Sequence, residues 1–262
     1  MNKAIILAAG QGSRMGHLTE NIPKALVNFL GEPIINYQIN VMRQLGINNI
    51  HIVRGYKKEQ FKITNVTYHD NLEGFNMIHS LFQAADEFKD KLIISYGDII
   101  YSSHVLNCLV NSIEDIVVIY DVDWLAQFSL RFPKPYNEAE TFKITSDNQI
   151  TELGQPIRDY TDVQGQFIGL IKLSSHGAKI FLSHYQKLKS NSKSFKGKDF
   201  RSIYTTEFLQ SLIDDGHKVT GCQIKKGWIE FDHINDLNLY EAAFQDGTLN
   251  EIINMSDIKN LS

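Results

Sequence analysis

The sequence predicts an α/β protein with a doubly wound, mostly parallel central sheet and a small antiparallel β insertion. Short apolar runs that are typical of strands buried on both faces, such as KAIILAA at 3–9, alternate with segments of helical periodicity. This alternation favours a parallel sheet with helices on its faces. The chain has 262 residues, of which 43% are hydrophobic, so it is long enough for one large domain with a sizeable core.

The first half of the chain supplies the alternation element by element. PIINYQINVMRQLG at 33–46 places apolar residues at helical spacing and ends in a glycine that is typical of a helix stop. NNIHIVRGY at 48–56 predicts the second strand, and FNMIHSLFQAADEF at 75–88 predicts the second helix. KLIISYGD at 91–98 and DIVVIYDVD at 115–123 predict the third and fourth strands.

The second half of the chain has a different order of elements. ETFKITSDNQITELGQ at 140–155 predicts a β-hairpin that turns at Asp147–Asn148. QFIGLIKLSS at 166–175 predicts a strand, and YTTEFLQSLIDDG at 204–216 predicts a helix closed by its glycine. HKVTGCQIKKGWIEFD at 217–232 returns to strand, with a last helix expected directly after it.

Two segments fall outside this pattern. KLKSNSKSFKGKDF at 187–200 is polar and predicts a mobile loop whose five lysines are solvated, the alternative being a phosphate lid. The C-terminal tail at 245–262 contains Leu249, Ile252 and Ile253, which could pack on the domain or on a second subunit.

Composition excludes several classes of function. The net charge of −4 provides no basic surface for nucleic acid. No apolar run reaches the roughly 18 residues of a membrane helix or the length of a signal peptide, so we expect a cytoplasmic protein without membrane insertion. Cys108 and Cys222 have no metal-type spacing and are expected to be reduced core residues.

LAAGQGSRMG at 7–16 is the segment most informative about chemistry. Its glycines fit neither the G-x-G-x-x-G dinucleotide fingerprint nor a P-loop, since no Lys-Ser or Lys-Thr follows. Gly10 and Gly12 allow backbone amides to approach a ligand, and Arg14 is a permanent cation for phosphate oxygens. The loop contains no acid, so it predicts an anion-binding pocket, the alternative being a plain strand-to-helix turn.

Other charged residues are expected at the same edge of the sheet. Lys24 follows a proline-stiffened turn eight residues beyond the loop and can supply a second cation. Asp98 ends a strand where a phosphate pocket is expected, which suits a Mg²⁺ ligand. In WIEFD, alternate residues share a face, so Glu230 and Asp232 point together and Phe231 points away. Taken alone, Lys24 would more often be a surface lysine, and the acidic pair could equally be exposed to solvent.

Together these motifs resemble the nucleotidyltransferases that activate sugar-1-phosphates and related phosphate esters. LAAGQGSRMG, PKAL, YGD and WIEFD match that family's pattern, and the resemblance covers roughly residues 2–244. It implies one Rossmann-like nucleotidyltransferase domain over 1–244, followed by a tail or helix at 245–262. The nucleotide-binding half would span about 1–135 and the acceptor-binding half about 136–244.

The resemblance also implies roles for individual residues. Arg14 and Lys24 would be the catalytic cations on the phosphates of a nucleoside triphosphate, and Asp98 and Asp232 would hold Mg²⁺. An acceptor oxygen attacks the α-phosphorus and pyrophosphate leaves, with positioning and charge supplying most of the catalysis. The implied nucleotide-binding residues are Leu7, Ala8, Ala9, Gly10, Gly12, Ser13, Arg14, Lys24, Asn71, Asn76, Ser80 and Gly97.

Within the family, the chain is most similar to the small cytidylyltransferases that act on phosphocholine, aminoethylphosphonate and phosphoglutamine. HDNLEGFNMIHSL, GQFIGLIK and GWIEFDHINDL carry this similarity, and the chain is expected to end near its catalytic core. We therefore expect CTP as the nucleotide and a CDP- or CMP-linked product that decorates a cell-surface polysaccharide or lipid. Asn71, Asn76 and Ser80 would lie near the nucleotide, although either asparagine could instead cap a helix.

The acceptor pocket is expected under the second half of the chain. Positive charge at its phosphate end and acidic or aromatic residues at its amine end would suit an amine-bearing acceptor. For each candidate the alternative is packing or a surface ion pair. The candidates are Tyr101, Lys172, Glu207, Trp228 and Glu230.

Two other functions stay open at this point. One is a sugar-1-phosphate uridylyl-, guanylyl- or thymidylyltransferase of the same fold. The other is a catalytically inactive, nucleotide-binding regulatory subunit, which retention of Arg14, Lys24, Asp98 and Asp232 disfavours. A homodimer is compatible with either.

Overall fold

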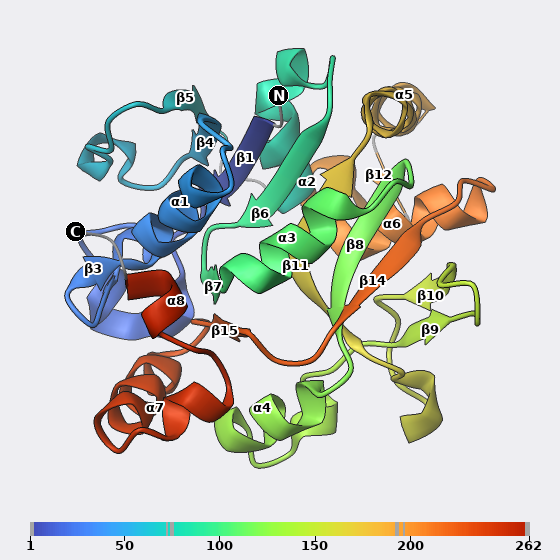
Figure 1. Cartoon of the computed structure of the whole chain (residues 1–262). Coiled ribbons are helices and arrows are strands. Elements are labelled where there is room, and N and C mark those ends of the chain that lie inside the picture. Colours follow the sequence, from blue (N-terminus) through green and yellow to red (C-terminus); the bar gives the residue numbers. More distant parts are fainter. Residues whose placement is uncertain (1–2, 72, 74–75, 192–193, 196, 260–262) are drawn as a thin grey trace.

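A seven-stranded central sheet with helices on both faces forms the body of the protein (Figure 1). The computed structural model describes residues 3–71, 73, 76–191, 194–195 and 197–259. Neighbouring strands run parallel except at β11, which is antiparallel to both β6 and β8. The predicted doubly wound, mostly parallel sheet is confirmed. In order across the sheet, the strands are β14 (Thr220–Ile224), β8 (Ile116–Asp121), β11 (Gln166–Leu173), β6 (Leu92–Tyr96), β1 (Lys3–Ala8), β4 (Asn49–Arg54) and β5 (Thr67–Asp70).

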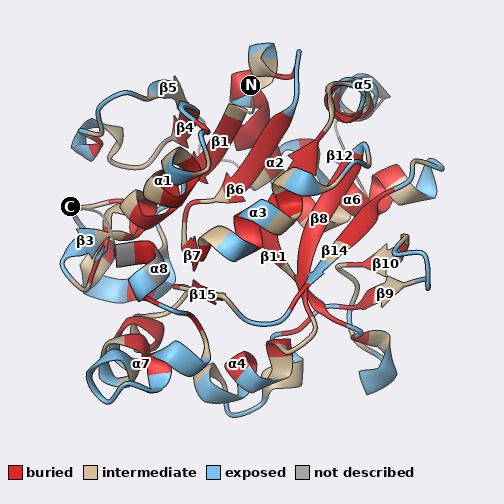
Figure 2. Cartoon of the chain, in the orientation of Figure 1, coloured by how far each residue is buried: buried red, intermediate tan, exposed pale blue. Residues whose placement is uncertain are grey.

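The sheet divides the core into two layers, and helices cover the layer on each face. On β1, Ala4 and Ile6 join the cluster that α1 and α3 cover, while Ile5 and Leu7 join the cluster under α2, α5 and α6. Burial of both faces explains why β1 is a continuous apolar run, and Figure 2 shows the central strands mostly buried. The α-helices are α1 (Ile34–Gln44), α2 (Met77–Leu81), α3 (Ser103–Asn111), α4 (Trp124–Arg131), α5 (Ser175–Asn191), α6 (Thr205–Asp214), α7 (Ile234–Gln245) and α8 (Ser256–Lys259).

Short strands pair outside the central sheet. The predicted hairpin at 140–155 is confirmed, with Asn148 at a positive φ of 62° in its turn. The short pairs are β2 (Asn28–Phe29) with β3 (Glu32–Pro33), β7 (Ile99–Tyr101) with β15 (Trp228–Glu230), β9 (Phe142–Ile144) with β10 (Ile150–Leu153), and β12 (Ser194–Phe195) with β13 (Lys198–Asp199). The 3₁₀ helices are η1 (Ser13–Thr19), η2 (Lys24–Leu26), η3 (Lys58–Gln60), η4 (Phe82–Glu87), η5 (Pro135–Asn137), η6 (Tyr160–Asp162), η7 (Phe200–Ser202) and η8 (Thr248–Glu251).

Two predicted elements are divided in the structure. The helix expected at 75–88, whose first residue lies outside the described ones, changes from α2 to η4 at Phe82, with a kink at Ala84. Phe82 there stacks on Tyr185 at a centroid distance of 3.8 Å. The strand expected at 217–232 divides into β14 and β15, because Lys226 and Gly227 both take positive φ and turn the chain out of the central sheet.

The segment expected to be a mobile loop at 187–200 is partly regular. Its first residues belong to α5, and its last residues form β12, β13 and the start of η7. Lys187 and Lys198 pair with Asp215 and Glu207 at 2.5 and 2.9 Å. Residues 192, 193 and 196 lie outside the described residues.

The C-terminal segment packs on its own domain. Leu249 and Ile253 are each 1% exposed and join the cluster that α1 and α3 cover. The Gly227 amide donates to the Ile252 carbonyl at 2.8 Å, which ties the tail to the turn before β15. Of the two alternatives for this segment, the structure therefore places it on the domain. No described helix is long and apolar enough to cross a membrane.

The two cysteines lie against each other between α3 and β14. Cys108 and Cys222 are free and half-buried rather than in the core, and their Sγ atoms lie 2.6 Å apart. Burial raises the pKa of the Cys222 thiol to about 12, with the neighbouring Cys108 acting in the same direction. The thiol form is therefore favoured at neutral pH.

Gly97 marks the closest approach between β1 and the end of β6. Its amide donates to the Leu7 carbonyl at 2.9 Å, and a Cβ at this position would lie only 2.6 Å from that carbonyl oxygen. The backbone of β1 cannot give way without disturbing the strand, so only glycine fits here.

Gly97→Ala should lower the free energy of unfolding by about 2 kcal/mol, the usual size of an overpacking effect in a close-packed interior. Gly10→Ala is the matched control, since a Cβ there would meet no atom within 4 Å. Urea denaturation followed by circular dichroism measures both variants. Equal stability of the two variants would contradict the close approach.

Candidate active site

The charged residues predicted to form a site converge at the carboxyl edge of β1 and β6. Asp98 lies two residues after the end of β6, and β7 then pairs antiparallel with β15, placing Ile99 opposite Glu230. The Phe231 amide donates to the Asp98 carbonyl at 2.9 Å, so Asp232 is brought beside Asp98 from 134 residues further along the chain.

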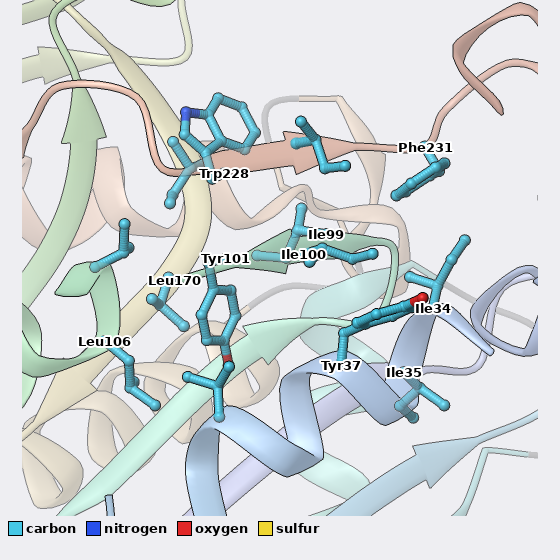
Figure 3. Close-up of a cluster of buried hydrophobic side chains, with 14 of the residues drawn as sticks. Ile34, Ile35, Tyr37, Ile99, Ile100, Tyr101, Leu106, Leu170, Trp228 and Phe231 are labelled. Carbon is cyan, nitrogen blue, oxygen red and sulfur yellow. The ribbon is translucent and has the colours of Figure 1, made fainter. Parts of the chain in front are cut away.

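Phe231 anchors this arrangement. It is fully buried, and its ring lies 4.9 Å from the ring of Phe29. Figure 3 shows it in the same cluster as Ile34 and Tyr37. Because Phe231 turns into the core, Glu230 and Asp232 both face the opposite way, into one cavity. The shared face predicted for these two carboxylates agrees with this geometry, although β15 itself ends at Glu230.

Lys24 connects the two aspartates. Its Nζ lies 2.8 Å from Asp98 Oδ2 and 2.7 Å from Asp232 Oδ1, and Arg14 Nη2 lies 2.7 Å from the same Asp232 oxygen. The Lys24 side chain is 11% exposed, whereas that of Arg14 is 60% exposed. Lys24 is thus a buried bridge, and Arg14 is a cation that remains accessible to a ligand.

The glycine-rich loop is folded around Lys24. Gly12 has φ 74°, and a Cβ there would lie 2.7–2.9 Å from Cβ, Cγ and Cδ of Lys24. Thr19 Oγ1 donates to the Gly12 carbonyl at 2.9 Å and closes the loop. Pro23 is extended and is followed by η2, which begins at Lys24. Gly12 is therefore needed twice, for its backbone angle and for the space that Lys24 fills.

The charges shift one another's protonation. Burial alone would lower the pKa of Lys24, but Asp98 and Asp232 outweigh it and hold that pKa above its ordinary value. Burial would raise the pKa of Asp232, but Lys24 and Arg14 reverse the effect and lower it. At neutral pH Asp232 is therefore ionised and Lys24 is protonated. Asp98 Oδ1 is also buried and has no hydrogen-bond partner among the described residues.

Arg131 and Asp236 form a second layer that sequence reasoning missed. The Arg131 side chain is fully buried and donates to both oxygens of Asp236 at 3.0 and 2.9 Å and to Glu230 at 2.8 Å. Asp236 Oδ2 also accepts from the amides of Asp232 and His233 at 2.7 and 2.8 Å. This fixes the backbone that carries Asp232. An acid three residues after His233 is a recognisable helix-start signal for Asp236, but Arg131 has no such signal.

A cavity of about 240 Å³ lies next to Asp232. Its wall combines carboxylates with aromatic rings from β6, α4, β11 and β15, and Arg14 stands at its edge. Partial burial raises the pKa of the Glu230 carboxyl; Arg131 opposes this, and Asp232 and Asp98 add to it. The lining residues include Glu138, Glu140, Glu230, Asp232, Tyr96, Phe128, Phe132, Phe167, Tyr204 and Trp228.

Of the residues predicted to contact the acceptor, Trp228 and Glu230 line this cavity and three do not. Lys172 lies at the opposite edge of the sheet, where its Nζ donates to the Ser112 carbonyl, because β11 runs antiparallel to its neighbours. Tyr101 is fully buried in the cluster of Figure 3. Glu207 caps α6 by accepting from the Tyr204 amide at 3.0 Å and also pairs with Lys198. The structure thus places Lys172 and Tyr101 away from this cavity and gives Glu207 a capping role, and contact of any of the five residues with an acceptor stays a prediction.

The predicted nucleotide residues divide similarly. Asn76 caps α2, accepting from the Met77 amide at 2.8 Å and donating to the Ser202 carbonyl at 3.0 Å, so its capping alternative is observed. Asn71 is 3% exposed and donates to Ser80 Oγ at 2.6 Å. Both side chains therefore have protein partners.

The end of β1 adjoins Gly55 and Gly97. Leu7 and Ala8 are buried, and the Leu7 and Ala9 carbonyls accept from the amides of Gly97 and Tyr56 at 2.9 and 3.0 Å. Gly10, Gly12 and Ser13 lead from this end to Arg14. A contact between any of these residues and a nucleotide stays a prediction.

Similarity to known proteins decides the family. The chain is 34% identical over 249 residues to the CTP:phosphoglutamine cytidylyltransferase of Campylobacter jejuni, which covers 90% of this chain and 98% of that protein. The chain belongs to the nucleotidyltransferase family. The family model of the MobA-like NTP transferase domain matches residues 4–132 of this nucleotidyltransferase. The predicted family is confirmed.

Two solved structures share the fold of this nucleotidyltransferase over nearly its whole length. The CTP:phosphocholine cytidylyltransferase of Streptococcus pneumoniae superposes with a TM-score of 0.71 at 24% identity, covering 93% of this chain and 99% of that one. The inositol-1-phosphate CTP transferase of T. maritima gives a TM-score of 0.73 at 22% identity, covering 100% and 97%.

Lys24→Met should destabilise the protein by about 3 kcal/mol at pH 7, because two partly buried carboxylates lose their shared cation. The lowered pKa of Asp232 stabilises the native state above the unfolded value of about 3.9, and this contribution disappears as the pH falls through the native value. The stability difference between wild type and variant should therefore shrink below about pH 4. Urea titrations between pH 3 and 7 measure it.

Lys62→Met, at an exposed lysine, is the control and should show a small difference at every pH. A difference for Lys24→Met that is independent of pH would contradict the coupling to Asp232.

Proposed function

We propose that this nucleotidyltransferase transfers the cytidylyl group of CTP to a small, amine-bearing phosphate or phosphonate and releases pyrophosphate. The observation that carries the proposal is the position of the Lys24–Asp98–Asp232 cluster beside a cavity walled by carboxylates and aromatic rings. The cluster suits a polyphosphate, and the cavity suits a positively charged group. The relatives named for phosphoglutamine and phosphocholine support CTP and a phosphate-bearing acceptor.

The two aspartates fit a divalent cation. Lys24 Nζ already bridges Asp98 Oδ2 and Asp232 Oδ1, so the cluster accommodates a positive charge between them. Asp98 Oδ1 is buried and lacks a partner among the described residues, which leaves one carboxylate oxygen available for ligation. Hard oxygen ligands of this kind are those that Mg²⁺ prefers. When bound by Asp98 and Asp232, Mg²⁺ would offset charge on the triphosphate.

The cations of the chain itself then have separate tasks. Arg14 is exposed at the mouth of the cavity and can grip phosphate oxygens in a fork. Lys24 is held in place by Gly12 and by the two carboxylates, so its charge is preorganised where negative charge develops on the leaving pyrophosphate. The acceptor oxygen is anionic near neutral pH, so no general base is required. It forms the new bond to the α-phosphorus while the bond to pyrophosphate breaks.

The cavity wall explains a preference for an amine. Glu138, Glu140 and Glu230 present carboxylates to it, and Trp228 and Phe128 present ring faces or edges. Carboxylates and aromatic rings together attract an ammonium group, a positive charge that a neutral sugar lacks.

A pyrophosphate-release assay tests the function directly. It crosses CTP, UTP, GTP and dTTP with phosphocholine, aminoethylphosphonate, phosphoglutamine and sugar-1-phosphates. Turnover should be largest for CTP with an amine-bearing acceptor. Preference for UTP, GTP or dTTP with a sugar-1-phosphate would establish the sugar-activating alternative, and nucleotide binding without turnover on any acceptor would indicate a regulatory subunit.

Asp98→Asn and Asp232→Asn should each lower kcat at least about a hundredfold, since each removes an ionised ligand from the centre of charge stabilisation. Circular dichroism should show that both variants fold. Asp246→Asn is the control, because Asp246 lies after α7 and accepts only from Thr248 among the contacts described. Full activity in either site variant would contradict the assignment.

The double variant Glu138→Gln/Glu140→Gln should raise KM for an amine-bearing acceptor about tenfold, the size of a lost hydrogen bond or ion pair to a charged group, with little change in KM for CTP. Glu114→Gln is the control, because Glu114 pairs with Lys218 and does not line the cavity. Equal increases in both KM values would place these glutamates near the nucleotide instead.

A further inference from the structure

A second group of metal-ligating side chains lies on the part of the sheet formed by β1, β4 and β5. His51 comes from β4, His69 from β5 and Glu87 from the last residue of η4. None of the three lines the cavity beside Asp232. The proposed reaction uses none of them.

Strand register brings these residues to one face. Lys3 pairs with Asn49, and Val53 pairs with His69. Alternate residues on a strand share a face, so Asn49, His51 and Val53 point the same way, together with Lys3 and His69 on the flanking strands. η4 packs over this face and delivers Glu87.

The distances match a compact donor set. His51 Nδ1 lies 2.9 Å from His69 Nε2, and His51 Nε2 lies 3.6 Å from Glu87 Oε2 and 3.0 Å from Asn49 Oδ1. One ligand atom from each of His51, His69 and Glu87 can be chosen so that all lie within 4.8 Å of one another. His51 is 4% exposed, while His69 and Glu87 are half-buried, so the group is reachable from solvent on one side.

We propose that His51, His69 and Glu87 form a binding site for a divalent transition metal of the Zn²⁺ class. Two imidazole nitrogens and one carboxylate oxygen are the donors that Zn²⁺ takes, with a water or the Asn49 amide oxygen completing four ligands. Mg²⁺ is disfavoured, because it prefers oxygen donors. Burial lowers the pKa of His51, which leaves its imidazole neutral and able to ligate at neutral pH.

Lys3 opposes metal binding, so its removal should raise the affinity for the metal, whereas removal of a ligand should lower it. Its Nζ lies 2.5 Å from Glu87 Oε2, so the ammonium now neutralises the carboxylate that the metal needs. A metal ion must displace this contact, and the cation of Lys3 also repels it. The site would hold η4 against β4 and β5, and none of its three ligands is a residue of the proposed reaction.

Zn²⁺ affinity of the purified full-length chain, measured by competition with a chromogenic chelator, tests the proposal. Wild type should bind one Zn²⁺ that survives Asp98→Asn, which separates this site from the proposed Mg²⁺ ligands. His69→Ala and Glu87→Gln should each lower the affinity for that Zn²⁺ at least about tenfold, and Lys3→Met should raise it. His104→Ala, at an exposed histidine on α3, should leave it unchanged.

Glu87→Gln preserves side-chain shape and keeps the test valid if His69→Ala does not fold. Three results would overturn the proposal. The wild-type protein could fail to bind Zn²⁺ at micromolar concentration, Asp98→Asn could abolish the binding, or His69→Ala and Glu87→Gln could both leave it intact. In that event the group is a hydrogen-bonded network of Lys3, His51, His69 and Glu87 only. Failure of this site would not affect the cytidylyl transfer assay, and failure of that assay would not affect Zn²⁺ binding.

Discussion

The contact on which the rest of the site depends is the ammonium of Lys24 between the carboxylates of Asp98 and Asp232. Two aspartates cannot remain ionised side by side in a partly buried place without a cation between them. Lys24 therefore allows the chain to bring two carboxylates together before any ligand binds, and a divalent cation would need both of them. In the proposed reaction the same ammonium would also face the charge that develops on the leaving pyrophosphate.

Much of the surrounding fold serves to hold this contact. Gly12 leaves room for the stem of Lys24, and pairing of β7 with β15 sets Phe231 opposite Asp98 and so brings Asp232 beside it. Phe231 fixes that pairing from the core side, and Asp236, held by Arg131, fixes it from the other. Position in this site is thus determined by rigid elements, which is what charge stabilisation without covalent chemistry requires.

Sequence reasoning predicted the parallel sheet and the convergence of Arg14, Lys24, Asp98 and Asp232, because strand ends of a parallel sheet share one edge and the glycine-rich loop has distinctive chemistry. It failed where strand direction mattered. β11 runs antiparallel, so its start faces the cavity and its end carries Lys172 to the opposite edge. The pattern of apolar and polar residues along a strand does not indicate its direction relative to the neighbouring strands.

Long-range partners were equally beyond local pattern. Arg131 meets Asp236 across 105 residues, and nothing in the sequence around Arg131 indicates this partner. The acidic and aromatic wall also joins residues from several distant elements. For Asn76 the sequence allowed two roles, and the hydrogen bond to the Met77 amide identifies the helix cap.

The most direct test of the account is the effect of Mg²⁺ on CTP affinity, measured by isothermal titration calorimetry in wild type and in Asp98→Asn. If Lys24 holds Asp98 and Asp232 ready for a divalent cation next to the triphosphate, Mg²⁺ should tighten CTP binding to wild type by at least about tenfold and leave the variant almost unchanged. The same Mg²⁺ enhancement in both proteins would contradict the account.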